Sequence, residues 1–417
     1  MRAMKPDRMK ATNRDRMRGT TGTDEGDGGE RMNTARGNRL RRALVFAAAG
    51  ILIVPVAGVG QQDVAADLRV NIDAARSYLE NAARETGFTG VVLIGHGDEV
   101  VLEEAYGFAD AELRVPMRTD HRFRLGSLTK PVTASAVLVA VDRGLLEMDT
   151  PACDLLPSCP AGWKDVTVRH LLTHSSGIED HFGDLDAVPV EATVGELRRV
   201  LDALPPDEPL GATPGAEYAY SNFNYVLLGA LLEEVVGAPW ESVLREFVFE
   251  PLGLRTMAYD DVYAIMEDRA RGYERDDSLG LRNIDYDDHA AYAAGGLLST
   301  AGDVFRWSRG MLSGVLFSPR LVAESLEPYL EDYGYGWQVR RFFDRRIYNH
   351  TGGIDGFSTH LAHYPDDGLT IVVLSNVEDD AAILRACDLA GRLFEWPVLA
   401  GAANADLTPR QRCGLER

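Results

Sequence analysis

Lysine is nearly absent from this chain of 417 residues: only four of its 43 basic residues are Lys. Lys5 and Lys10 lie close to the N-terminus, and past residue 60 only Lys130 and Lys164 remain. Arginine supplies positive charge almost everywhere else. Because arginine cannot release its proton in a protein and a buried lysine can, a lysine in such a chain points to chemistry that needs a neutral amine.

Cysteine is also scarce, with four residues and no Cys-x-x-Cys or Cys/His cluster of the kind that binds zinc. Cys153 and Cys159 flank a short loop, and we predict a disulfide between them in an exported protein. Cys387 and Cys413 are candidates for a second pair whose geometry the sequence does not define. His170 and His174 are four residues apart, but a third ligand is lacking nearby, which favours structural roles over a metal site.

Basic residues are few relative to acidic ones in the main part of the chain. Residues 1–60 carry 12 basic and 6 acidic side chains, which leaves 31 basic and 58 acidic residues, a net charge of −27, for the remainder. Such an acidic surface would repel nucleic acid and anionic lipid, so we exclude both as partners.

Residues 1–60 form a separate region with a polar start and an apolar end. Arg39, Arg41 and Arg42 precede a 17-residue apolar run, Ala43–Val59, that ends in small residues. This pattern predicts an export signal and a periplasmic or extracellular protein. The alternative is an uncleaved anchor, which would be the protein's one link to a membrane.

Apolar periodicity past residue 60 follows two different spacings. Strand-like patterns occur near both ends, over 90–94, 99–105, 346–350, 358–364 and 370–375. Helical patterns cover 63–86, 127–146, 194–204, 224–236, 240–249, 301–313 and 381–394. We therefore predict one α/β domain of the α+β type over 61–400, followed by a tail over 401–417. Its antiparallel sheet is built from both termini and flanked by helices, with a mostly helical region inserted.

Ser127 and Lys130 form a Ser-x-x-Lys motif. Side chains three residues apart on a helix share a face, so a hydroxyl would lie beside a potential base. Pro131 requires the helix to begin close by, because proline is tolerated only in the first turn. The motif alone is weak, since Ser127 could simply cap the helix.

Two further motifs strengthen this interpretation. Tyr220-Ser221-Asn222 precedes an apolar helix, and His350-Thr351-Gly352-Gly353 closes a strand. Their order and spacing resemble the serine β-lactamase and penicillin-binding protein superfamily, most closely its class C β-lactamase, DD-peptidase and esterase branch. The resemblance spans about residues 65–395 and includes the segments 90–107, 171–177 and 295–300.

The resemblance implies a β-lactamase/transpeptidase-like fold and a role for each motif residue. Ser127 would be the nucleophile and Lys130 its base, which must lose a proton despite an unperturbed pKa of about 10.4. Tyr220 would carry the proton to the leaving group, and Asn222 would bind a substrate carbonyl or orient Lys130. The N–H groups of Ser127 and Gly353 would form an oxyanion hole.

The third motif departs from the lactamase pattern at His350, where that pattern has Lys. A histidine is neutral much of the time at pH 7, which weakens the case for a dedicated penicillin-destroying enzyme. Two roles are open: a protonated imidazole that binds a substrate carboxylate, or a structural hydrogen-bond donor. Thr351, Gly352 and Gly353 are small enough to let a substrate lie against the backbone.

We therefore expect an exported serine hydrolase that forms an acyl-enzyme with an ester, peptide amide or lactam, and uses no cofactor or metal. The alternative is a penicillin-binding sensor that stays acylated. A catalytically inactive interaction module is disfavoured because Ser127, Lys130, Tyr220 and Asn222 are all present. A Gly-x-Ser-x-Gly motif is absent, so an α/β-hydrolase is unsupported.

Overall fold

A computed structural model describes residues 61–156, 158–182, 200–261, 264–284, 291–342 and 345–394. The predicted export signal, the tail over 401–417 and Cys413 lie outside these ranges. Within them, no helix combines the length and the hydropathy that crossing a bilayer requires.

A six-stranded antiparallel sheet forms the centre of the fold, in the order β10-β11-β12-β13-β1-β2. Its strands are β1 (Gly90–His96), β2 (Glu99–Tyr106), β10 (Gln338–Phe342), β11 (Arg345–Ile354), β12 (Phe357–Tyr364) and β13 (Leu369–Ser375). Gly90 of β1 lies opposite Ser375 of β13, and the pairing runs to His96 opposite Leu369. The prediction that strands from the two ends of the domain share one sheet is therefore confirmed.

The sheet is buried on both faces because its inner strands are apolar at consecutive positions. In β1, Val92 and Ile94 belong to one hydrophobic cluster, and Val91 and Leu93 belong to another. Successive strand residues point to opposite faces, so each cluster covers one side of the sheet. Helices on both sides are needed to bury such strands.

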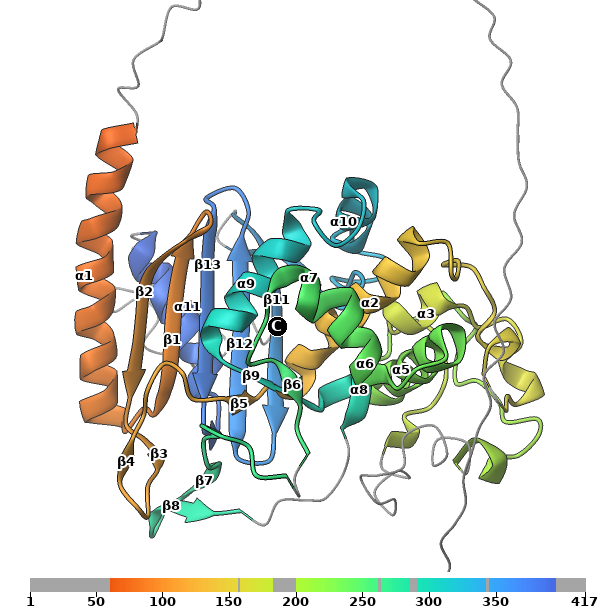
Figure 1. Ribbon diagram of the computed structural model, residues 1–417, viewed down its shortest axis with the longest axis horizontal. Helices are drawn as coiled ribbons and strands as arrows, with labels where there is room; N and C mark the ends of the chain where they lie inside the picture. The colour runs from red at the N-terminus through yellow and green to blue at the C-terminus, as the bar shows by residue number, and fades with distance from the viewer. Residues whose placement is uncertain are drawn as a thin grey trace, which may run out of the picture. The chain divides into compact units, whose positions relative to one another are not determined.

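The helices on one face come from opposite ends of the domain (Figure 1). Helices α1 (Gln61–Thr86) and α11 (Ala381–Leu393) pack together on one face, while α9 (Ala301–Leu312) covers the other. The α9 contact is close: a side chain at Gly95 would place its Cβ 2.2 Å from the ring of Phe305. Glycine at this position therefore lets α9 lie against β1.

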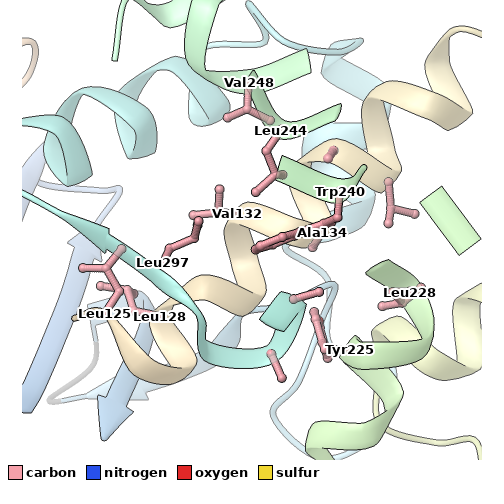
Figure 2. Close-up of a cluster of buried hydrophobic side chains, with 14 of the residues drawn as sticks. Leu125, Leu128, Val132, Ala134, Tyr225, Leu228, Trp240, Leu244, Val248 and Leu297 are labelled. Atoms are coloured by element: carbon pink, nitrogen blue, oxygen red, sulfur yellow. The ribbon is translucent and has the colours of Figure 1, made fainter. Parts of the chain in front are cut away.

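The helical region is assembled around α2 (Thr129–Asp142), in which every residue from Thr129 to Ala140 is buried. Figure 2 shows apolar side chains from several segments, including Leu128, Val132 and Trp240, meeting around this helix. The other helices described are α3 (Val168–Leu172), α5 (Asn222–Val236), α6 (Trp240–Leu244), α7 (Glu250–Leu252), α8 (Tyr292–Gly295) and α10 (Pro319–Ser325). This packing fixes the position of the N-terminal end of α2.

The remaining short strands that the structure describes form three small sheets. The strands are β3 (Phe108–Asp110), β4 (Val115–Pro116), β5 (Phe123–Arg124), β6 (Ala258–Tyr259), β7 (Tyr273–Asp276), β8 (Gly280–Asn283), β9 (Leu297–Ser299) and β14 (Val377–Glu378). They pair in the orders β14-β7-β8, β3-β4 and β5-β9-β6. Arg124 of β5 is buried and donates from Nε to Asp260 at 2.5 Å, and Arg269 reaches the other carboxylate oxygen at 2.8 Å. This ion pair anchors the strand that leads into Ser127.

Several element boundaries differ from those expected. Helix α2 ends at Asp142 rather than near residue 146, because Gly144 adopts a left-handed φ of 70°. The helix expected over 240–249 changes to a wider turn, η5 (Arg245–Phe249), after α6. Strand β10 was not expected at all, since its sequence Gln-Val-Arg-Arg-Phe lacks an apolar alternation. The helix predicted over 194–204 lies mostly outside the described residues.

Cys153 and Cys159 form a disulfide with their Cα atoms 5.3 Å apart, as predicted. The bridge closes a short loop, and both half-buried cysteines pack against the hydrophobic cluster that contains the helical region.

Replacing both cysteines with serine should lower the free energy of unfolding by about 2 kcal/mol, because closing so short a loop removes little entropy from the unfolded chain. Urea unfolding of the double variant and of the parent, both without reductant, measures the difference. Peptide mass spectrometry without reductant should find residues 153 and 159 linked, and two free thiols there would contradict the assignment.

Candidate active site

Ser127 lies in a tight 3₁₀ turn, η1 (Gly126–Leu128), directly before α2. Gly126 has a φ of 54°, and a Cβ there would lie only 2.8 Å from the carbonyl oxygen and 2.9 Å from the nitrogen of Gly353. A side chain at position 126 would therefore push η1 away from β11. Glycine brings the Ser127 turn against the backbone of that strand.

Lys130 lies one turn further on and is completely buried. Its Nζ is 3.0 Å from Ser127 Oγ, 2.7 Å from Asn222 Oδ1 and 2.9 Å from the carbonyl oxygen of Ala294. The three contacts come from η1, α5 and α8. The Ser-x-x-Lys prediction that the hydroxyl and the amine are neighbours is confirmed by this geometry.

Burial lowers the pKa of Lys130 from its usual 10.5 to about 7, although Asp180 partly opposes the shift. A neutral amine has two N–H donors and one lone pair. The carbonyl of Ala294 can only accept, and so can Asn222 Oδ1, so these two contacts use both N–H groups. The lone pair is then left for the hydrogen of Ser127 Oγ, which is the arrangement a general base requires.

Asn222 is the first residue of α5, and the exposed loop residue Asp180 fixes it there. The carboxylate of Asp180 accepts from the backbone N–H groups of Asn222 at 3.2 Å and Phe223 at 2.9 Å. It also accepts from Ser221 Oγ at 3.3 Å. An acidic group at a helix N-terminus satisfies donors that have no intrahelical partner.

Tyr220 covers the amine from the outside. Its ring centroid is 5.0 Å from Lys130 Nζ, and 39% of the residue surface is exposed. Packing of the phenol against protein raises the pKa of Tyr220 well above its usual range, while a hydrogen bond with Ser127 partly offsets the effect. Tyr220 therefore stays protonated at neutral pH and is suited to donate a proton rather than to act as the first base.

His350 lies within β11 and is 1% exposed. Its Nδ1 is 2.7 Å from the carbonyl oxygen of Thr351, which can only accept, so Nδ1 carries the proton. Its Nε2, 3.0 Å from Tyr333, then accepts from that hydroxyl. Burial lowers the pKa of His350 to about 3. Both ring nitrogens are used in a neutral imidazole, which favours the structural role among the two that the sequence leaves open.

The remaining residues of the third motif bring β11 close to η1. A Cβ at Gly352 would lie 2.0 Å from the carbonyl oxygen of Leu125. Gly353 is exposed with nothing within 4 Å of a Cβ, and Thr351 is half-buried opposite His360. The N–H groups of Ser127 and Gly353 as an oxyanion hole stay a prediction that this close approach of backbones supports.

Three contributors to the site were missed by sequence reasoning. Ala294 contributes a backbone carbonyl, for which no side-chain signal exists. Asp180 acts through its position before α5 in space, which no local sequence pattern indicates. His174 was expected to be structural, and its ring centroid lies 4.3 Å from that of Tyr220.

Comparison with known proteins supports the same assignment. The model of the Beta-lactamase family matches residues 75–393, which is well over half of the chain. The chain belongs to the Beta-lactamase family.

The relatives of this chain include a penicillin-binding protein and an esterase. A penicillin-binding protein of Bacillus subtilis (strain 168) is 27% identical over 348 residues, covering 77% of this chain and 77% of the relative. An esterase of Burkholderia gladioli is 36% identical over 215 residues, covering 47% of this chain and 52% of the relative. These relationships identify this Beta-lactamase family member as a serine hydrolase.

A solved structure supports the fold. The octameric penicillin-binding protein homologue from Pyrococcus abyssi superposes with a TM-score of 0.68 at 24% identity, covering 82% of this chain and 79% of that one. The predicted β-lactamase/transpeptidase-like fold of this Beta-lactamase family member is confirmed.

Replacing Lys130 with arginine should lower kcat/KM by about 10²–10⁴-fold, nearly as much as alanine, because a guanidinium stays charged and cannot accept the proton of Ser127. In the parent, kcat/KM should rise as pH increases through about 7, where the amine becomes neutral. The matched control is Lys164→Arg, at an exposed position, which should keep both the rate and the pH profile. An active Lys130→Arg variant would show that the amine is only a counter-ion.

Because His350 is neutral down to a pKa of about 3, it should contribute no pH dependence to substrate binding from about pH 5.5 to 8. Because Lys130 titrates within the same range, each curve of KM against pH is compared with that of His350→Gln. For one uncharged and one anionic ester, the parent and the variant should show the same dependence on pH. His350→Lys should impair both substrates, since it loses the Tyr333 hydrogen bond. Weaker binding of the anionic ester as pH rises that disappears in His350→Gln would instead support the carboxylate role.

Proposed function

We propose that this protein is an exported serine hydrolase that forms an acyl-enzyme at Ser127 with uncharged esters or amides. The observation that carries the proposal is the completely buried Lys130 amine, 3.0 Å from Ser127 Oγ, with its other two contacts made to acceptors. Such an amine can act as the base for Ser127 at neutral pH.

In the acylation step, Ser127 Oγ attacks the substrate carbonyl while its proton passes to Lys130. The negative oxygen that develops is stabilised by the N–H groups of Ser127 and Gly353. The bond to the leaving group then breaks as Tyr220 donates its phenolic proton to that group, and Tyr220 recovers a proton from the Lys130 ammonium. In deacylation, a water molecule attacks the acyl carbonyl and its proton passes to the neutral Lys130–Tyr220 pair. The bond to Ser127 Oγ then breaks and Oγ takes a proton back from this pair, which releases the acid and restores Ser127.

The charges around Ser127 favour uncharged substrates over anionic ones. His350 is neutral, and burial brings the pKa of Lys130 down to about 7. Asp180 contributes a carboxylate close enough to influence the pKa values of both Lys130 and Tyr220. A substrate carboxylate would meet no permanent cation among these groups, which argues for ester or amide hydrolysis rather than penicillin hydrolysis.

Export is part of the proposal because of two features. The basic and apolar pattern within residues 1–60 matches a signal sequence, and the Cys153–Cys159 disulfide suits an oxidising compartment. Expression of the full chain in a bacterial host, followed by mass determination of the N-terminus of secreted protein, tests cleavage. Recovery of the uncut chain in the membrane fraction would favour the anchor.

The catalytic proposal is tested with purified protein, p-nitrophenyl esters and a fluorescent penicillin. We expect repeated turnover of the esters and its loss in Ser127→Ala, because only the attacking oxygen is removed. Ser313→Ala, at an exposed serine that directly follows α9, is the matched control and should turn over like the parent. A single lasting penicillin label without ester turnover would instead identify a sensor, and no reaction at all would identify an inactive module.

A further inference from the structure

His174 has an unusual backbone and no exposed surface. It follows α3 in the segment Leu-Thr-His-Ser-Ser-Gly, with a φ of 53° in the left-handed region and 0% exposure. Non-glycine residues seldom adopt this conformation, and surrounding structure must hold them in it. The conformation directs both the carbonyl group and the ring of His174 toward one segment, 219–221.

The contacts of His174 bracket Tyr220 on both sides. Its carbonyl oxygen accepts from the N–H of Ala219 at 2.8 Å, and its Nδ1 accepts from the N–H of Ser221 at 3.2 Å. Between these two bonds, its ring packs against that of Tyr220 with centroids 4.3 Å apart. One buried residue therefore holds the backbone before and after Tyr220 and also one face of its ring.

The protonation of His174 follows from the same contacts. Because Nδ1 accepts from Ser221, the neutral ring carries its hydrogen on Nε2. Burial keeps the pKa of His174 well below its usual value, so the ring is neutral. Its Nε2 is buried and has no hydrogen-bond partner among the described residues. Leaving a buried donor unpaired costs free energy, so packing alone would be better served by an apolar side chain.

We infer that His174 is a positioning residue for Tyr220, holding the phenol where it can protonate the leaving group. This inference rests on the proposed function, in which Tyr220 supplies that proton. Loss of the positioning contacts should therefore impair substrates in proportion to how much their leaving group needs a proton.

Two esters of the same acid separate this effect from a general loss of activity. A p-nitrophenolate leaves without a proton at neutral pH, whereas an ethyl ester must release an alcohol that receives one. The ratio of kcat/KM for the p-nitrophenyl and ethyl esters of butyrate reports the proton donation, because the acyl-enzyme is identical. Titration of active sites with a fluorophosphonate corrects every rate for protein that is misfolded.

Glycine and asparagine are the matched replacements, since both tolerate a left-handed φ. His174→Gly removes the ring and the acceptor. His174→Asn keeps an acceptor at the position of Nδ1 and loses only the ring. We expect His174→Gly to lower kcat/KM for the ethyl ester by about 10²-fold, while the p-nitrophenyl ester changes by less than about threefold. His174→Asn should recover part of the ethyl ester activity.

Two further variants serve as controls. Tyr220→Phe should show the same selective loss, and adding His174→Gly to it should cause no further selective loss, since the two changes act through one group. His170→Asn alters another half-buried histidine whose Nδ1 accepts from a backbone N–H, that of Thr167 at 3.2 Å. It should leave the ratio of the two esters unchanged.

If Tyr220→Phe is selective and His174→Gly lowers both esters equally per active site, the positioning role is overturned while the proposed function stands. If Tyr220→Phe itself lowers both esters equally, the proton-donor role of Tyr220 fails, and the inference fails with it. A selective loss in His174→Gly that Asn partly restores supports both.

Discussion

Burial of the Lys130 amine is the interaction on which the rest of this site depends. Removing the ammonium from water lowers its pKa to about 7, and polar groups of Ser127, Asn222 and Ala294, from η1, α5 and α8, take the place of the solvent. A more open arrangement would return the pKa toward its usual value and leave no base at neutral pH. The dense packing around α2 is therefore a requirement of the chemistry as well as of stability.

The second requirement is the close approach of η1 and β11. Gly126 and Gly352 have no side chains, and each would place a Cβ within 2.8 Å of backbone oxygen from the opposite segment. The Arg124–Asp260 ion pair holds the strand that leads into η1, and Thr359 Oγ1 donates to the carbonyl of Leu125 at 2.7 Å. These contacts place Ser127 between the helical region and the backbone of the third motif.

Sequence patterns predicted most of the fold because they record which residues must be buried. The apolar runs of β1 and β13 predicted strands, and the helical patterns of α1, α5, α9 and α11 predicted helices close to those observed. Strand β10 was missed because it lies at the edge of the sheet. An edge strand can carry charged residues on its exposed side, so its sequence does not show the apolar pattern of an inner strand. The role of His350 stayed open because its neutrality comes from burial and from the nearby Lys130, and because its partner Tyr333 meets it only in the folded protein.

The sequence by itself determined the type of fold, the Ser-x-x-Lys pair and the order of the three motifs, because spacing on one helix and apolar periodicity are local properties. Tertiary structure alone decided the pKa of Lys130, the tautomer of His350 and the contributions of Ala294, Asp180 and His174. Each of these depends on desolvation or on a hydrogen bond between segments far apart in the chain. Such effects arise only when the folded protein excludes water and brings those segments together.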